Sequence, residues 1–226
     1  MRSVDKSMVP AVTVPRLALY LRKLRELQGR GVQTVSSKEL AERIDLNAAQ
    51  IRKDFSYFGE FGVRGVGYDV PRLIGEITKS LGLHRSWNVI IVGAGLLGTA
   101  LARYKGFSEQ GFRLVGMFDS SPKVVGKSYG QGKVRDVGEL EEFARSETVD
   151  IAIITVPAHA AQATIDRVVA PTVGVTAVLN FAPVKVFAPK DVIVRQVDLS
   201  SELMFLSFYL DREQVYVRLR RHTTRG

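Results

Sequence analysis

The sequence predicts an α/β protein: an N-terminal winged helix-turn-helix, then a doubly wound parallel sheet of the Rossmann type, then a C-terminal domain-swapped helix. Three observations support this fold class. Amphipathic patterns with helix-capping residues fill residues 15–58, strand-like and helix-like segments alternate over 89–197, and an apolar helical pattern follows. A glycine-rich sequence, VIIVGAGLLGTA at 89–100, opens the alternating part.

Length and composition indicate a globular protein of two domains. The 226 residues exceed the usual single-domain size of about 100–150, and 46% hydrophobic with 24% charged residues is ordinary for a chain with a buried core. The absence of cysteine excludes disulfides, thiolate metal sites and cysteine nucleophiles, and we expect no metal site. No stretch reaches the roughly 18–20 apolar residues of a membrane span, and no signal-peptide core is present, so we expect a cytoplasmic protein.

A glycine-containing stretch at 80–87 separates the helical pattern from the first strongly apolar strand. We therefore expect a DNA-binding domain at 1–83 and a nucleotide-binding domain at 84–197. A dimerisation helix and a basic tail are expected at 198–226.

The net charge of +9 is unevenly distributed. The excess of positive charge is five in residues 1–80, zero in 81–211 and four in 212–226. A neutral middle between basic ends indicates a polyanionic partner for the first segment, since neutralised phosphates provide most non-specific affinity for nucleic acid. Solubility alone is the other explanation of the charge.

Capping signals mark three helical segments in the first domain. Pro15 opens the first segment. Ser36 followed by Glu39 forms a capping box for the second, and Asn47 followed by Gln50 repeats this pattern for the third. The first segment carries apolar residues at helical spacing, at Leu17, Tyr20, Leu21, Leu24 and Leu27.

The second and third segments, KELAERI at 38–44 and AAQIRKDFSYF at 48–58, are joined by a short turn, as in a helix-turn-helix. With Ile51, Phe55 and Phe58 facing inward, the third helix leaves a donor-rich outer face suited to phosphates and base edges. A plain helical bundle is the alternative interpretation, and packing beside Phe58 is the alternative for the Tyr57 ring. The predicted DNA contacts on this face are Gln50, Arg52, Lys53, Ser56 and Tyr57.

The segment GEFGVRGVGYDVP at 59–71 follows at once and predicts a β-hairpin, or wing, with a tight tip. Its glycines bracket apolar residues and one cation, Arg64, which a wing would place against a minor groove or a phosphate. A phosphate-binding loop is a poor alternative, since no GKS or GKT sequence follows. Double-stranded DNA is therefore the predicted partner of the first domain.

The glycine-rich segment predicts a dinucleotide site. It follows a strand, opens a helix and is followed by Asp119 at the end of the next strand, close to the expected spacing. Gly93 permits the tight turn, Gly95 lets the backbone approach a pyrophosphate, and Gly98 allows the helix to pack on the strand. Free N–H groups at the helix start then meet the phosphates.

Asp119 indicates NAD(H) rather than NADP(H), because its carboxylate would bind the adenosine ribose and disfavour a 2′-phosphate, although Lys123 weakens this preference. A strand-end turn is the alternative role of Asp119. TVP and NFAP end later strands, where such sheets collect ligands, or are ordinary strand-ending turns. The predicted cofactor-binding residues are Gly93, Ala94, Gly95, Leu96, Leu97, Gly98, Asp119, Lys123, Thr155, Val156, Pro157, Asn180 and Phe181.

We expect the cofactor to be sensed rather than used in catalysis. About 130 residues follow the fingerprint, too few for a separate substrate domain of typical size. Only His159 lies near the expected pocket as an acid–base candidate, and a histidine at a helix start is more often a surface residue. The prediction therefore contains no catalytic residue.

The segment DLSSELMFLSFYLDREQ at 198–214 predicts a helix that begins at Asp198 and is apolar around most of its circumference. Its apolar run is too short to span a bilayer, so we expect it to insert into a partner subunit of a homodimer, with Phe205 and Phe208 at the interface. Docking against its own domain is the alternative. A dimer suits DNA, because two recognition helices about 34 Å apart can read a palindrome.

Blocks along nearly the whole chain resemble the Rex family of redox-sensing transcriptional repressors. They are SSKELAERIDLNAAQIRKDFSYFGEFGVRGVGY, VIIVGAGLLGTALARYKGF, TVP, NFAP and VDLSSELMFLSF, of which RKDFSYFGEFGVRGVGY is highly specific. The resemblance implies a winged helix, a Rossmann domain that binds NADH and NAD+, and a homodimer closed by exchanged C-terminal helices. It also implies that NADH releases the protein from palindromic operators of fermentation and respiration genes, while NAD+ competes.

The resemblance further implies a set of switch residues. Arg22, Tyr104 and Asp198 match the family's switch positions, with Asp198 pairing the partner's Arg22 or Tyr104 according to the bound cofactor. Leu199 stands where some relatives have Phe beside the nicotinamide, so a looser grip on the reduced ring is expected. An apolar pocket formed by the exchanged helix should prefer the neutral dihydronicotinamide to the cationic nicotinamide.

Two rival functions fit the same residues. A small NAD-dependent oxidoreductase with an accessory helical domain should oxidise NADH with a carbonyl substrate. A regulator that binds CoA or an acyl-nucleotide in the same sheet should be stabilised against heat by CoA and not by NADH.

Overall fold

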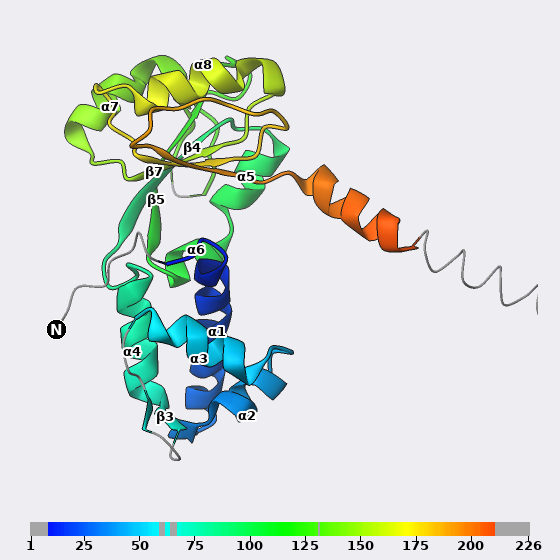
Figure 1. Cartoon of the computed structure of the whole chain (residues 1–226). Helices are drawn as coiled ribbons and strands as arrows, with labels where there is room; N and C mark the ends of the chain where they lie inside the picture. The colour runs from blue at the N-terminus through cyan, green and yellow to red at the C-terminus, as the bar shows by residue number, and fades with distance from the viewer. Residues whose placement is uncertain (1–8, 59–61, 64–66, 131, 211–226) are drawn as a thin grey trace, which may run out of the picture. The chain divides into compact units, whose positions relative to one another are not determined.

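The structure is a computed structural model and describes residues 9–58, 62–63, 67–130 and 132–210 (Figure 1). The chain divides into two compact units, residues 1–86 and residues 87–226. No helix in these described ranges is long and apolar enough to cross a membrane.

The first unit is a winged helix. The strand β3 lies between β1 and β2 and pairs antiparallel with both, so β2 and β3 confirm the predicted hairpin. The hairpin tip, including Arg64, lies outside the described residues. The elements of this unit are α1 (Thr13–Gly29), β1 (Thr34–Val35), α2 (Ser37–Glu42), α3 (Ala48–Ser56), β2 (Gly62–Val63), β3 (Gly67–Asp69) and α4 (Val70–Ser80).

The helices of the first unit form around one shared core. The predicted apolar stripe of α1, from Leu17 to Leu27, is buried, and Ile51 and Phe55 of α3 join the same cluster. Ser36 and Glu39 form the predicted capping box of α2, with a hydrogen bond in each direction between side chain and backbone. The predicted helix-turn-helix of α2 and α3 is therefore confirmed.

A fourth helix, α4, corrects the prediction of three. The Asp69 side chain caps it by accepting a 2.8 Å hydrogen bond from the Arg72 N–H, and Pro71 fits its first turn. The helix buries Leu73 and Ile77 in the core. The helix was not predicted because its start signals, Asp69 and Pro71, stand within the segment 59–71 that was assigned to the hairpin.

The second predicted capping box is incomplete. The Asn47 side chain accepts a hydrogen bond from the Ala49 N–H at 2.7 Å and so caps α3. The Gln50 amide instead donates to the Asp54 carboxylate one turn later, at 2.8 Å. The Gln50 side chain therefore binds the buried Asp54 carboxylate on the same helix face and not the backbone of the N-cap residue Asn47.

The second unit is a doubly wound parallel sheet in the lateral order β6-β5-β4-β7-β8-β9, which confirms the predicted Rossmann arrangement. The order reverses between β4 and β7, the point where such sheets bind ligands. The elements are β4 (Trp87–Val92), α5 (Leu96–Ala102), α6 (Lys105–Glu109), β5 (Phe112–Asp119), β6 (Arg135–Asp136), η2 (Val137–Glu139), α7 (Leu140–Ser146), β7 (Ile151–Ile154), α8 (Ala158–Val169), β8 (Ala177–Asn180) and β9 (Ile193–Gln196).

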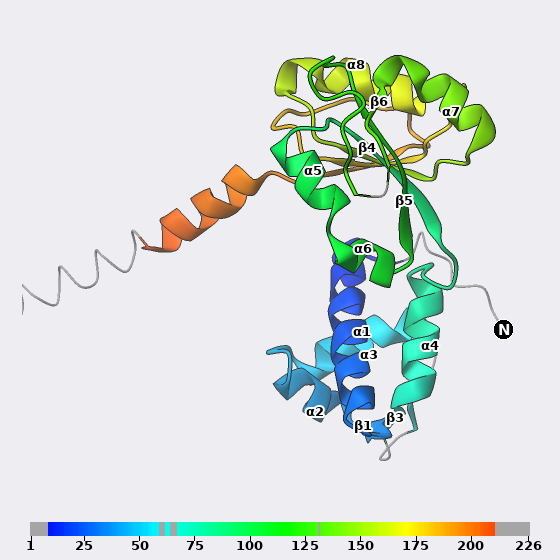
Figure 2. The ribbon, with the colours of Figure 1, turned by 180° about the vertical axis from the view of Figure 1, so that it is seen from behind.

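Both faces of the central strands are covered. Figures 1 and 2 show α7 and α8 on one face of the sheet and α5 on the other. On the first face, Ile90 belongs to a cluster with Phe118 and Ile165, and on the second face Ile91 belongs to a cluster with Met117. Burial on both sides explains why these strands are near-continuous apolar runs.

The helix that the glycine-rich segment was predicted to open is in fact two short helices. It is interrupted at Tyr104, whose backbone is extended with φ −75° and ψ 106°. The Tyr104 ring lies over Gly106, where a Cβ atom would be 2.6 Å from it, and packs edge-on against Phe107 with 5.2 Å between ring centroids. This packing accompanies the break and depends on the absence of a side chain at Gly106.

The connection between β8 and β9, residues 181–192, contains no helix. Gln162 of α8 holds it through two hydrogen bonds of 2.9 Å to the Phe187 backbone, so the connection lies on the α8 side of the sheet. On the opposite face, a hollow of about 250 Å³ is lined almost entirely by apolar residues, Leu179 and Ile193 among them.

Residues 199–210 form the described part of the predicted C-terminal helix, and residues 211–214 of that prediction lie outside the described residues. Asp198 caps it: one carboxylate oxygen accepts from the Ser200 N–H at 2.9 Å and the other from the Ser201 hydroxyl at 2.8 Å. Its large apolar side chains are exposed by between 50% for Tyr209 and 69% for Leu203. Within the described chain, this helix therefore lacks a covering surface.

Candidate functional site

The glycine-rich turn after β4 is built against Thr155. The Thr155 hydroxyl donates a 2.8 Å hydrogen bond to the carbonyl of Gly93, whose φ is +110°. A Cβ atom at Gly93 would be 2.7 Å from the Thr155 carbonyl, and one at Gly98 would collide with the Gly93 carbonyl oxygen. Both positions therefore require glycine.

A crevice of about 650 Å³ opens beside this turn, at the carboxyl edge of the sheet. At Gly95 the position of a Cβ atom is open space, so a ligand can approach the bare backbone there. Bare backbone beside a carboxylate and a hydroxyl suits a diphosphate and a ribose. Of the predicted set, the crevice brings together Gly93, Ala94, Gly95, Asp119, Thr155, Val156 and Pro157.

Asp119 braces the turn as well as facing the crevice. One carboxylate oxygen accepts from the Ala94 N–H at 2.6 Å, and the other accepts from the Ser121 N–H at 2.8 Å. Each carboxylate oxygen has two lone pairs, so one remains on each for a ribose hydroxyl. The two interpretations of Asp119, turn residue and ribose acceptor, are therefore compatible.

Four predicted cofactor residues near the turn do not line the crevice. Gly98 is buried inside α5, beneath the turn. Leu96 is 95% exposed, with Leu97 also exposed beside it in the first turn of α5. Lys123 is exposed and lies outside the lining, although its neighbour Val124 belongs to it.

Asn180 and Phe181 hold the end of β8. Asn180 is fully buried; its amide donates to the Gln196 side chain at 2.8 Å and its carbonyl oxygen accepts from the Ala182 N–H at 3.0 Å. Phe181 packs with the core cluster on the α5 side of the sheet. The structure does not bring these two residues to the crevice.

Sequence reasoning missed several residues that line the crevice. They lie at or after strand ends that the sequence did identify, and residues beyond the carboxyl ends of neighbouring parallel strands share one edge, which was the available signal. His159, which the sequence places near the pocket, lines it at the start of α8. The missed residues are Val92, Ser120, Ser121, Val124, Val137, Ala160 and Thr164.

The outer face of α3 keeps most of its predicted donors accessible. Arg52, Lys53 and Ser56 are exposed, whereas Tyr57 and Gln50 are half-buried. Arg52 donates to the Ser37 hydroxyl at 3.1 Å, and the Ser56 hydroxyl donates to the Lys53 carbonyl at 2.7 Å. The two cations thus remain on a surface that can meet phosphates.

Asp54 is a buried carboxylate that sequence reasoning missed. Arg16 of α1 donates to both of its oxygens, at 2.6 and 2.7 Å, and the Tyr20 hydroxyl donates at 2.7 Å. Burial opposes the charged form, but the hydrogen bonds from Arg16, Tyr20 and Gln50 outweigh it and hold the pKa of Asp54 below its ordinary value. Its position among Ile51, Phe55 and Phe58 at helical spacing was the signal that it faces inward.

The residues that match the family's switch positions lie at accessible places. Arg22 is exposed on α1, and Tyr104 is 61% exposed between α5 and α6. The hydrogen bonds from Ser201 and Ser200 hold the pKa of Asp198 below its ordinary value. Asp198 is therefore an anionic cap at the start of the C-terminal helix.

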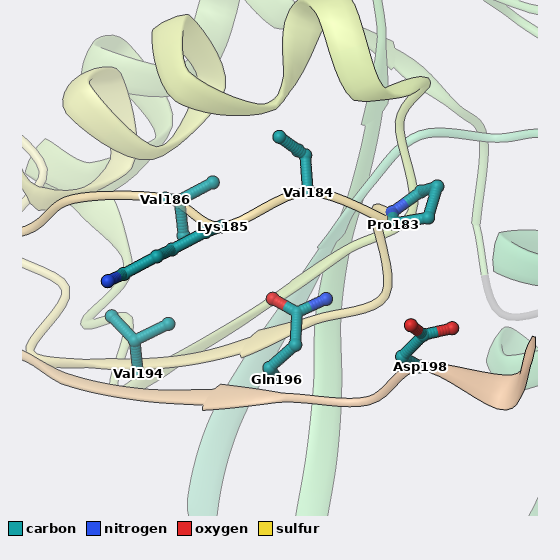
Figure 3. A pocket seen from close by; sticks show the side chains of 7 residues that line it. All are labelled: Pro183, Val184, Lys185, Val186, Val194, Gln196 and Asp198. Atoms are coloured by element: carbon teal, nitrogen blue, oxygen red, sulfur yellow. The ribbon is translucent and has the colours of Figure 1, made fainter. Parts of the chain in front are cut away.

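Asp198 also borders a second hollow, of about 340 Å³, between β9 and residues 183–186 of the preceding connection. Figure 3 shows Gln196 and Asp198 on the same side as Pro183, with the Lys185 amine at the opposite end. Gln196 is held by its hydrogen bond to the Ala182 carbonyl at 2.7 Å. The end of β9, which leads into the C-terminal helix, is held to β8 by the hydrogen bonds from the Asn180 amide to Gln196 and from the Val197 N–H to the Asn180 carbonyl.

Two family models match the chain. One, described as "Putative DNA-binding protein N-terminus", matches residues 8–56, and one described as "CoA binding domain" matches residues 84–184. The redox-sensing transcriptional repressor Rex of Streptomyces coelicolor is 49% identical over 91% of this chain and 79% of its own length. The Rex of Chloroflexus aurantiacus is 46% identical over 91% of this chain and 96% of its own.

Solved structures are similar over the same length. A crystal structure of RSP in complex with β-NAD+ and operator DNA has a TM-score of 0.88 and 40% identity, covering 95% of this chain and 98% of that one. A crystal structure of RSP in complex with β-NADH has a TM-score of 0.83 and 39% identity, covering 95% and 100%. RSP is described as a Rex-family repressor. On this agreement of sequence and fold, the chain belongs to the Rex family of redox-sensing transcriptional repressors.

Proposed function

We propose that this chain is a DNA-binding repressor that senses the ratio of NADH to NAD+ and leaves palindromic operators of fermentation and respiration genes when NADH binds. One observation supports the proposal most directly: a single chain contains two sites. One is a helix-turn-helix whose outer face is rich in hydrogen-bond donors, and the other is a Rossmann crevice at which the backbone of Gly95 is open to a ligand. The descriptions of the similar RSP structures, with β-NAD+ and operator DNA or with β-NADH, support both halves.

The crevice fits NAD(H). Gly95 offers open backbone for the diphosphate, and the remaining lone pairs of Asp119 suit the adenosine ribose. A 2′-phosphate would meet the negative charge of Asp119, and Lys123, outside the lining, offers it little compensation. When bound, the cofactor supplies only a neutral or a cationic nicotinamide ring, which the protein distinguishes without turnover.

The outer face of α3 is the proposed reading surface for DNA. Arg52 and Lys53 supply cations, while Ser56, Tyr57 and Gln50 supply groups that form hydrogen bonds. The positive excess of residues 1–80 supports attraction to phosphates. Contact of Arg64 with a minor groove stays a prediction, because this residue lies outside the described part of the chain.

Two uncovered apolar surfaces support an exchanged dimer. The helix at 199–210 exposes its apolar side chains, including Phe205 and Phe208, and the sheet face around Leu179 and Ile193 is hollow and apolar. Burial of each against a second copy removes both from water, which is the main driving force of association. We therefore place the C-terminal helix of one subunit against the other subunit.

The switch is proposed to act at the start of the exchanged helix. Asp198 caps that helix, so its pairing with the partner's Arg22 or Tyr104 changes how the helix begins. A ligand shifts such an equilibrium only through unequal affinity for the two states, and an apolar pocket prefers the neutral reduced ring. Leu199, 57% exposed in the described chain, would grip that ring less firmly than an aromatic side chain. Because the DNA and the nucleotide pool share one compartment, we expect the protein in the cytoplasm.

A mobility-shift titration tests the proposal. A palindromic operator, at one fixed salt concentration, is titrated with protein in the presence of NADH or NAD+. NADH should release the DNA and NAD+ should compete with NADH; equal operator affinity with and without saturating NADH would refute the proposal. Thermal unfolding with CoA and NADH, and a test for NADH oxidation with carbonyl substrates, separate the two rival functions.

A further inference from the structure

We propose that Asp54 is a positioning residue for base recognition: it fixes the side-chain amide of Gln50 in one orientation, so that Gln50 selects adenine and rejects guanine. This inference rests on the proposed function of α3 in DNA binding. It concerns a buried residue that no DNA can touch, acting through a neighbour that DNA can reach.

The Asp54 carboxylate is held rigidly. It is completely buried and receives two hydrogen bonds from the Arg16 guanidinium, at 2.6 and 2.7 Å, and one from the Tyr20 hydroxyl at 2.7 Å. Tyr20 is itself fully buried and packs edge-on against Phe55, with ring centroids 5.3 Å apart. With donors from α1 on both oxygens, the carboxylate cannot rotate without breaking a bidentate ion pair.

Gln50 is oriented by this carboxylate. Its Nε2 lies 2.8 Å from the Asp54 Oδ1, one helical turn away on α3. An ionised carboxylate only accepts hydrogen bonds, so the NH₂ group and not the carbonyl oxygen of Gln50 must face it. The carboxylate of Asp54 therefore determines the orientation of the Gln50 amide, with the NH₂ group toward Asp54.

The fixed orientation gives Gln50 a defined pattern of donors and acceptors. Asp54 occupies one hydrogen of Nε2. Within the described part of the chain, this leaves Oε1 to accept a hydrogen bond and the second hydrogen of Nε2 to donate one. This pair matches the major-groove edge of adenine, which offers the N6 amino group and the N7 acceptor. Guanine offers two acceptors, O6 and N7, so its O6 would face Oε1. A glutamine free to turn could instead point its NH₂ at guanine.

The position of Gln50 suits this role. It is the third residue of α3, and the N-terminal residues of a recognition helix are the ones that face base edges. Gln50 is half-buried and its Nε2 is held by Asp54, so the part of the residue that remains exposed is available to DNA. Only a purely structural role for Asp54, joining α1 to α3, competes with this interpretation.

The test measures base preference rather than affinity alone. Binding of the full-length protein is compared across palindromes in which each symmetric pair of positions is varied, at one salt concentration. Gln50→Ala identifies the position that Gln50 reads, and the wild type should prefer adenine to guanine there by on the order of tenfold. Asp54→Asn frees the amide to turn and should reduce that preference several-fold at the same position, leaving the others unchanged. The double variant should match Gln50→Ala, since the two residues act as one unit.

Two comparisons keep the outcome decisive. Asp69→Ala removes the cap of α4 in the same unit without touching Gln50, so it controls for lost stability and should leave every base preference intact. In wild-type protein labelled with ¹⁵N-glutamine, the side-chain amide of Gln50 should exchange hydrogen more slowly than that of exposed Gln28.

Three results would overturn the inference. They are a uniform loss of affinity in Asp54→Asn with base preference retained, a wild-type preference for guanine at the Gln50 position, and equal exchange rates for Gln50 and Gln28. Failure of the wild type to bind any palindrome would instead refute the proposed function itself.

Discussion

The Asp119 carboxylate accepts a 2.6 Å hydrogen bond from the backbone N–H of Ala94, so the residue expected to bind the ribose also holds the glycine-rich turn in place. The glycine-rich turn and the proposed ribose acceptor are therefore joined by a hydrogen bond and ordered before a ligand binds. Because the same side chain also accepts from the Ser121 N–H, its removal leaves two backbone donors without their partner.

Asp119→Ala should weaken binding of NADH and of NAD+ together, by about 10–100-fold, since hydrogen bonds to a charged group contribute about 1.5–3 kcal/mol. Calorimetric titration of both nucleotides measures this. Asp69→Ala is the control, because Asp69 also accepts a hydrogen bond from a backbone N–H, that of Arg72, and lies in the first unit, outside the crevice lining. Unchanged NADH affinity in Asp119→Ala would remove Asp119 from the site.

Two glycine substitutions should separate folding from binding. Gly93→Ala is strained at φ +110° and clashes with Thr155, so it should lower the free energy of unfolding by about 2–4 kcal/mol. Gly95→Ala meets open space and should change stability by less than about 0.5 kcal/mol, while its methyl group projects toward the ligand and weakens NADH binding at least tenfold. Thermal unfolding and NADH titration of both variants measure the contrast; equal behaviour would contradict it.

Gly106→Ala should disturb the switch without unfolding the protein. A Cβ atom there would lie 2.6 Å from the Tyr104 ring, and this exposed ring can move aside at a stability cost of about 0.5–1 kcal/mol. NADH should still bind, but the NADH concentration that releases half of the operator should rise several-fold. Tyr104→Phe, which keeps the ring and removes the hydroxyl, tests whether the hydroxyl itself is the switching group.

The Asp54 ion pair should make stability fall in acid. The folded-state pKa of Asp54 is lowered, so its contribution is fully present above the unfolded pKa of about 3.9 and is lost as the pH falls through the folded value. Urea unfolding from pH 6 down to about pH 2.5 measures this. The variant Arg16→Met with Asp54→Leu should lose less stability over that range, and an identical pH dependence would show that the pair contributes nothing.

Phe205→Lys should convert the dimer to monomer, because it places a charge in an interface that we propose to be apolar. Sedimentation velocity gives the assembly state, and operator affinity should fall at least tenfold when two half-sites are no longer bound together. Glu142→Lys adds an exposed lysine to α7, on the opposite face of the sheet from the apolar hollow, and serves as the control. A dimer that survives Phe205→Lys would argue against exchange of this helix.

The sequence allowed the fold class, the helix-turn-helix and the wing to be predicted, because these depend on local signals. The capping box of Ser36 and Glu39 and the apolar stripe of α1 lie within single elements, so spacing alone reveals them. The glycine turn is likewise local. Its partner Thr155 was identified only as a strand-end residue, and its hydrogen bond to Gly93 joins positions 62 residues apart.

What could not be predicted depends on distant contacts. The spacing of Asp54 indicates that it faces inward but not which residues bind it, because Arg16 and Tyr20 come from α1, 38 and 34 residues away. Asn180 lies at a strand end, where ligands often bind, but its side-chain amide donates a hydrogen bond to Gln196 of the neighbouring strand. The break at Tyr104 arises from a ring folded over Gly106, which helix propensity does not describe.

The helix-free connection between β8 and β9 has a consequence for how the protein matures. Gln162 draws this connection onto the α8 side, so the chain's own described residues leave the other face of β8 and β9 bare. If a second molecule supplies the missing layer, the final step of folding is bimolecular, and its rate rises with the square of the concentration of newly made chains. At a low concentration of chains, monomers would then assemble slowly and stay exposed to proteolysis for longer. The rate of synthesis would therefore affect the amount of assembled repressor in the cell more than proportionally.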